Sequence, residues 1–182
     1  PDFPAICVGI FSKTIVDELL EKYSGEVLGY SKFCTGWVPI YRVHAFETDV
    51  ALFLPHVGAP AAAGFVEDIW AWGGRHFVFC GAAGTLCRDI AHGHLIVPTA
   101  AVRDEGLSYH YLPPADEIAL QPRCVEACRE ALDSLHYPYI EGKTWTTDAF
   151  FRETEKKAQR RREQGCVSVE MECAGLAAVA QF

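Results

Sequence analysis

The stretch AICVGIFSKT, residues 5–14, decides the fold because an apolar run passes directly into a short polar turn. A short, nearly continuous apolar run is typical of a strand that is buried on both faces. The amphipathic segment at residues 15–23 follows the turn and is expected to form a helix. Strand, turn and helix in this order are the first step of an α/β fold.

The same alternation of strand and helix continues through the chain. We expect further strands at residues 27–33, 37–46, 50–54, 76–80, 94–102, 139–145 and 166–170. We expect helices at residues 61–72, 122–135, 153–164 and 174–182. These elements predict a three-layer α/β/α fold, in which helices cover both faces of a central mixed, mostly parallel sheet.

The domain organisation is expected to be simple. The sequence contains no linker, internal repeat or low-complexity segment, and 182 residues suit a single core. We therefore expect one domain over residues 1–182. Because the chain stops inside an apolar helix, we expect the strand and helix that would complete this domain to be missing.

Composition and charge exclude several classes of protein. The net charge of −8 is unfavourable for a general nucleic-acid or anionic-membrane surface, since both partners select clustered Lys and Arg. The one basic run, residues 156–162, is flanked by glutamates and is expected to form a solvated helix face. No stretch reaches the ~18 apolar residues that a membrane span needs. We therefore expect a cytoplasmic protein.

The eight cysteines are scattered through apolar segments, where a free thiol behaves as a small hydrophobe. Cys124 and Cys128 are four residues apart on an expected helix, but no second pair of ligands accompanies them. We therefore expect no metal site and no disulfide framework.

Two carboxylates flank a methionine in the stretch SVEMECAGL, residues 168–176. A buried carboxylate without a polar partner loses its hydration, and a bound ribose would supply that partner. A carboxylate accepts two hydrogen bonds side by side from vicinal hydroxyls, while Met171 offers a soft surface to the sugar. The residues also allow a second interpretation, in which Glu170 and Glu172 only complement the dipole of a helix start.

Six short segments in a fixed order carry a resemblance to a known family. They are Cys7-Val8-Gly9, Val57-Gly58-Ala59-Pro60, Gly81-Ala82-Ala83-Gly84, Val102-Arg103-Asp104-Glu105-Gly106, Thr147-Asp148-Ala149-Phe150 and Val169-Glu170-Met171-Glu172. Together they resemble the nucleoside phosphorylase superfamily, specifically its uridine phosphorylase-like branch. The resemblance implies that inorganic phosphate attacks the anomeric carbon of a nucleoside and releases a free base and ribose 1-phosphate.

The resemblance also implies where each part of the substrate binds. Phosphate would lie at glycine-rich turns that expose backbone N–H groups, with lysines adding charge and Lys32 serving a neighbouring subunit's site. The implied phosphate-binding residues are Gly9, Lys13, Lys32, Gly81, Ala82, Ala83 and Gly84. The implied ribose-binding residues are Glu170, Met171 and Glu172.

For the base, the resemblance implies that Phe150 stacks on the ring, that Phe151 packs behind it and that Arg152 donates to a base carbonyl. The residues by themselves equally allow a Phe-Phe pair that packs into the core. The family needs no metal and no cofactor other than phosphate as co-substrate, and no catalytic residue is assigned. Its members form homo-oligomers, either dimers or hexamers built from dimers.

The sequence departs from the family at the anion site. Phe79 stands where the family usually has arginine, and Ala82 and Ala83 stand where it has hydroxyl or thiol side chains. Lys13 replaces an arginine and therefore lacks the bidentate fork. A hydrolytic nucleosidase and a non-catalytic nucleoside-binding relative are the two alternatives. Because a nucleosidase needs an acid where this chain has Lys13, phosphorolysis is favoured; base and sugar preference do not follow from the sequence.

Overall fold

The computed structural model describes residues 3–91 and 93–182. The chain divides into two compact units, the first comprising Pro1–Val57 and Ala61–Ala82, the second Gly58–Pro60 and Ala83–Phe182. Within the described residues, each unit contains one five-stranded mixed sheet. The predicted α/β class is confirmed, but the strands are shared between two sheets rather than one, because the chain leaves β5 through the 81–83 turn and then pairs with β10. The single-domain expectation stays a prediction.

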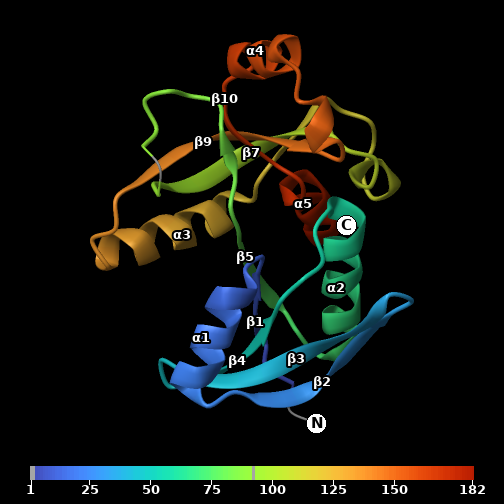
Figure 1. Ribbon diagram of the computed structural model, residues 1–182, viewed down its shortest axis with the longest axis vertical. Helices are drawn as coiled ribbons and strands as arrows, with labels where there is room; N and C mark the ends of the chain where they lie inside the picture. The colour runs from blue at the N-terminus through green and yellow to red at the C-terminus, as the bar shows by residue number, and fades with distance from the viewer. Residues whose placement is uncertain (1–2, 92) are drawn as a thin grey trace. The chain divides into compact units, whose positions relative to one another are not determined.

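The first sheet has the strand order β2-β3-β4-β1-β5. Its strands are β1 (Ile6–Ile10), β2 (Glu26–Phe33), β3 (Gly36–Ala45), β4 (Thr48–Phe53) and β5 (His76–Cys80). β1 pairs in parallel with β4 and β5, whereas β2, β3 and β4 pair antiparallel (Figure 1). Phe46 and Glu47 connect β3 to β4 with φ of 50° and 60°, as a two-residue hairpin turn of the mirror-image type requires.

Two helices cover opposite faces of the first sheet. On α1 (Lys13–Tyr23), which begins at an N-cap serine, Val16 packs with Leu52 of β4. On α2 (Ala59–Trp72), Phe65 packs with Phe53 of the same strand. Because successive side chains of a strand point to opposite faces, Leu52 and Phe53 define the two sides of the sheet.

The second sheet has the order β6-β10-β9-β7-β8, with parallel pairing among β10, β9 and β7. Its strands are β6 (Gly84–Thr85), β7 (Leu95–Asp104), β8 (Glu117–Ala119), β9 (Tyr139–Thr147) and β10 (Cys166–Glu170). The expected strands include neither the two-residue β6 nor the three-residue β8. Only Ile118 of the three β8 residues is buried, so no apolar pattern marks that strand.

The helical elements of the second unit are η1 (Ser108–His110), α3 (Pro122–Ser134), η2 (Phe150–Arg152), α4 (Glu155–Glu163) and α5 (Cys173–Gln181). On α5, Ala174 and Ala178 pack against Ala101 of β7. Trp145, wholly buried, packs with Val102 in a second cluster, which lies on the other face because Val102 directly follows Ala101. No helix in the described part of the chain has the length and apolar character to cross a membrane.

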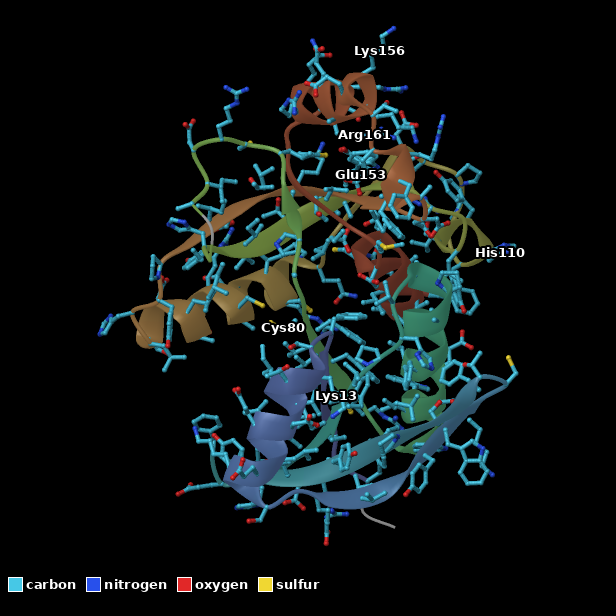
Figure 2. All side chains as sticks on the ribbon, in the orientation of Figure 1. Lys13, Cys80, His110, Glu153, Lys156 and Arg161 are labelled. Carbon is cyan, nitrogen blue, oxygen red and sulfur yellow. The ribbon has the colours of Figure 1, made fainter. Side chains whose placement is uncertain are left out.

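The basic run forms α4, and none of its residues is buried. Lys156 projects outward from the helix (Figure 2). Arg161 and Lys157 instead lie over the ring of Trp145, and each places a nitrogen 3.2 Å from the carboxylate of Asp104. Burial raises the pKa of Asp104, but hydrogen bonds from Lys157, Trp145 and Arg161 outweigh it and hold that pKa below its ordinary value. The helix is therefore only partly a solvated face.

Gly175 provides a test of the packing between α5 and the start of α2. A Cβ atom at Gly175 would lie 2.7 Å from the Cβ of Ala59 and 3.1 Å from Leu107. We expect Gly175→Ala to lower the free energy of unfolding by about 1–3 kcal/mol, because overpacking displaces the helix. Urea denaturation measures the change. Gly29→Ala is the matched control, since open space surrounds Gly29; equal stability of the two variants would contradict the expectation.

Candidate functional site

The turn between β10 and α5 brings together the residues that the sequence singled out. β10 ends at Glu170 and α5 begins at Cys173, so Met171 and Glu172 form the connection (Figure 1). β10 and its neighbour β9 are parallel, and the turn lies at their carboxyl ends. In α/β proteins this edge of the sheet is where ligands bind. The turn is therefore the candidate site in the second unit.

Both oxygens of the Glu170 carboxylate accept hydrogen bonds from donors of the same chain. Its Oε2 accepts hydrogen bonds from the backbone N–H groups of Glu172 and Cys173, each at 2.7 Å. Its Oε1 accepts a hydrogen bond of 2.6 Å from the hydroxyl of Thr146, which in turn accepts one from the N–H of Ala174. These contacts satisfy N–H groups that a helix start leaves unpaired. Glu170 thus caps the start of α5, as the second interpretation expects, and its ribose role stays a prediction.

The pKa of Glu170 reflects a competition between burial and these hydrogen bonds. Burial raises the pKa above its ordinary value, and the negative charge of Glu172 acts in the same direction. The hydrogen bonds from Thr146, Glu172 and Cys173 lower it but do not outweigh burial. Glu170 is therefore an acid that the fold holds at an electrostatic cost.

Glu172 is less enclosed and is oriented by a different segment. Its Oε1 accepts a hydrogen bond of 2.6 Å from the backbone N–H of Gly58, which has φ of +98° and directly precedes α2. Burial raises the pKa of Glu172, while the N–H groups of Gly58 and Met171 act to lower it. The carboxylate lies at the start of two helices, α2 and α5, whose dipoles favour a negative charge there. Both Met171 and Glu172 remain partly exposed to solvent.

A buried polar network fixes the loop beside α5. The guanidinium of Arg103, at the end of β7, donates a 2.7 Å hydrogen bond to the hydroxyl of Ser108. That hydroxyl donates to Glu105, whose other oxygen accepts from the N–H groups of Leu107 and Ser108 at 2.7 and 2.9 Å. All three network side chains are buried. Because each polar group has a partner, the network holds Leu107 against Gly175 without leaving a buried charge unpaired.

The three predicted base-binding residues form η2, immediately after β9. The rings of Phe150 and Phe151 lie 4.3 Å apart with an interplanar angle of 42°. Their side chains are 52% and 89% exposed, so the core-packing interpretation of the pair is wrong. Asp148 accepts a 2.9 Å hydrogen bond from the N–H of Gly106, which ties the end of β9 to the loop after β7. Stacking by Phe150 and donation by Arg152 stay predictions.

The predicted phosphate-binding residues are divided between the units. Gly9, Lys13, Lys32, Gly81 and Ala82 belong to the first unit, and Ala83 and Gly84 to the second. In the first unit, a Cβ atom at Gly9 would lie 2.6 Å from the ring of Phe79, and one at Gly81 would lie 3.1 Å from the ring of Phe11. The two glycines therefore leave room for aromatic rings as well as exposing backbone.

The lysines and the second-unit glycine also have partners within the fold. Lys13, the first residue of α1 (Figure 2), pairs with Asp17 at 2.5 Å, and Lys32 lies over the ring of Trp37 at 4.5 Å. Gly84 pairs with Val169 on β10. A Cβ atom at Gly84 would lie 2.9 Å from the side chain of Val169. Phosphate binding by these residues stays a prediction. Among the described side chains, no three His, Cys, Asp or Glu groups gather as metal ligands would.

A sequence model of the phosphorylase superfamily matches residues 12–182. The chain belongs to this superfamily. A guanosine phosphorylase of Halorubrum lacusprofundi is 28% identical over 138 residues, covering 74% of this chain and 56% of the relative. A uridine phosphorylase of Thermococcus kodakarensis is 31% identical over 114 residues, covering 61% and 41%. The chain thus spans about half the length of the curated relatives it matches.

Solved structures agree with the superfamily fold. A purine nucleoside phosphorylase from Toxoplasma gondii, in complex with immucillin-H, superposes with a TM-score of 0.85 at 19% identity, covering 99% of this chain and 72% of the other. A uridine phosphorylase from Vibrio fischeri gives 0.84 at 23% identity, covering 97% and 73%. The predicted family and fold class are confirmed.

Three residues that build this candidate site are absent from the predicted site residues. Thr146 and Gly58 hold the two glutamates, and Arg103 organises the neighbouring loop. A signal existed for Arg103, since an arginine that ends an apolar strand needs a partner once it is buried. No local signal marks the pairing of Gly58 with Glu172, which are 114 residues apart.

The raised pKa of Glu170 makes a pH-dependent prediction. The folded protein binds this proton more tightly than the unfolded chain, so its contribution to stability is present below the ordinary glutamate value of about 4.3 and is lost as pH rises through the raised pKa. We therefore expect the wild type to gain stability relative to Glu170→Gln as pH falls from 7 toward 4.3.

Denaturant unfolding at several pH values measures this difference. Glu130→Gln on the exposed side of α3 is the control, because it removes one negative charge outside the turn. A wild type that loses stability relative to Glu170→Gln on acidification would contradict the direction of the shift.

Proposed function

We propose that the protein is a nucleoside phosphorylase, which cleaves the N-glycosidic bond of a ribonucleoside with phosphate and releases a free base and ribose 1-phosphate. The observation that carries the proposal is the Glu170-Met171-Glu172 turn. Glu170 is used to cap α5, and this leaves the partly exposed Glu172 carboxylate fixed by Gly58 at the carboxyl end of β10. Relatives named guanosine, uridine and purine nucleoside phosphorylase support the same reaction.

In this proposal Glu172 accepts hydrogen bonds from the vicinal hydroxyls of the ribose. Burial raises the pKa of Glu172, which means that burial disfavours its charged form. Hydroxyl donors of a bound ribose stabilise the charged carboxylate, so ribose binding offsets part of the electrostatic cost of burial. Met171 places its thioether against the apolar face of the sugar. A ribose held in this way is positioned for a transition state with oxocarbenium character.

The base and the phosphate occupy the sites that the family resemblance implied. The exposed ring of Phe150 offers a face for stacking on the base, with Phe151 beside it and Arg152 as donor. The glycine turns and Lys13 supply N–H groups and positive charge to phosphate. The reaction needs no metal or cofactor besides phosphate, and its uridine-like or purine base is left open.

A hydrolytic nucleosidase is the second candidate, and two observations favour it. The ring of Phe79 lies against Gly9, where the family usually supplies an arginine, and the charge of Lys13 is paired with Asp17. Both features weaken an anion site, because charged hydrogen bonds contribute about 1.5–3 kcal/mol each. Water would then replace phosphate as the attacking group.

The other properties of the protein are proposed on the family and the composition. We propose a homo-oligomer, either a dimer or a hexamer built from dimers, in which Lys32 reaches a neighbouring subunit's phosphate site. We propose a cytoplasmic location and no nucleic-acid or membrane partner, in keeping with the net charge of −8.

Base release from uridine and from inosine, with and without phosphate, tests the reaction in purified full-length protein. We expect release that requires phosphate, with ribose 1-phosphate as the second product. Release without phosphate, giving free ribose, would establish the hydrolytic candidate instead. Tight nucleoside binding without turnover would reduce the protein to a binding module.

Variants of Glu172 test the ribose site. We expect Glu172→Ala to lower kcat/KM for ribosides by about tenfold or more, since one charged hydrogen bond is worth at least about 1.4 kcal/mol. Because the same change removes the contact to Gly58, the thermal midpoint is measured in parallel. Glu130→Ala is the control on α3. Near-normal kinetics of a folded Glu172→Ala protein would refute the ribose role.

A further inference from the structure

The exposed side of α3 carries two thiols, those of Cys124 and Cys128. Residues four apart on a helix lie one above the other on the same face. Val125, in contrast, is buried, so the helix packs against the fold through the side that carries Val125. Both thiols are exposed and belong to the same helix, α3.

Helix geometry disfavours a direct disulfide between them. Cβ atoms at this spacing are about 5–6 Å apart, whereas a disulfide brings its two Cβ atoms to about 3.5–4.5 Å. A single atom bonded to both sulfurs spans a wider gap. With bonds of about 2.3 Å, as zinc makes to thiolate, the sulfurs lie roughly 3.5–4 Å apart and the helix needs little distortion. The spacing therefore selects a bridging atom.

The number of ligands narrows the choice of that atom. Zinc in proteins takes four ligands, or three and a water. In residues 3–91 and 93–182 no group of three His, Cys, Asp or Glu side chains is placed to supply them. A monosubstituted trivalent arsenical needs only two thiolates, because its third bond is to its own organic group. Two sulfurs on one helix face match this requirement.

The electrostatics of the two thiols also favour binding to one bridging atom. Partial burial raises the pKa of the Cys128 thiol, and proximity to Cys124 raises it further. Two thiolates side by side therefore repel each other. Formation of two As–S bonds consumes both S–H groups, so the pair never has to carry the two charges that repel each other.

We propose that Cys124 and Cys128 form a dithiol site that binds one monosubstituted trivalent arsenical. The two S–H groups react with R–As=O, two As–S bonds form, and the two protons leave with the oxygen as water. Arsenic stays trivalent, and no oxidant or reductant is consumed. The site is independent of the proposed nucleoside chemistry.

Phenylarsine oxide is the probe, applied to the reduced full-length protein and followed by a wash with a monothiol, which removes adducts held by one sulfur. Intact mass spectrometry counts the retained phenylarsenic groups. We expect about one per wild-type chain, and at least about tenfold less in Cys124→Ser and in Cys128→Ser. Circular dichroism checks that each variant is folded.

Two controls make the result specific. Cys34→Ser and Cys80→Ser remove other exposed thiols and are expected to retain the adduct. Glu126→Cys in the Cys128→Ser background moves the second thiol two residues from Cys124, where the side chains do not face each other, and is expected to lose it. Retention by folded Cys124→Ser or Cys128→Ser protein, or no retention by the wild type, would overturn the proposal.

Discussion

The second unit depends on the partly buried carboxylate of Glu170. It accepts hydrogen bonds from Thr146 on β9 and from two N–H groups at the start of α5, and so joins strand, turn and helix at one point. These bonds satisfy donors that a helix start leaves unpaired, and they offset much of the cost of burying a charge. Burial still raises the pKa of Glu170. The result is a rigid turn that presents Met171 and Glu172.

Close packing then positions Glu172 itself. The N–H of Gly58 holds its carboxylate, and the absence of a side chain at Gly175 lets α5 approach Ala59. The loop after β7 completes this arrangement, because the buried Arg103 organises it through Ser108. The small residues allow close packing, and the satisfied polar groups hold the loop in place. The position of Glu172 depends on both.

In the first unit, aromatic side chains pack at the predicted anion site. Its glycines at the predicted anion site lie against the aromatic rings of Phe79 and Phe11. The rings belong to apolar packing around β1 and β5, in which Phe79 also contacts Phe53 edge-on. Aromatic packing and anion binding place opposite demands on the same segment, since one excludes water and the other needs exposed N–H groups. The outcome of this conflict decides whether phosphate or water attacks the nucleoside.

Apolar periodicity and short motifs are local properties, so they were enough to predict the α/β class, most strands and helices, and the superfamily. They missed the short strands β6 and β8, neither of which has an apolar pattern, and they placed all strands in one sheet. They left the roles of Glu170 and Phe151 undecided. Only the tertiary structure separated the capping Glu170 from the partly exposed Glu172 and placed Phe151 in solvent. The reason is physical: burial and hydrogen-bond partners are set by segments such as Gly58 and Thr146, which are distant in sequence from the residues they hold.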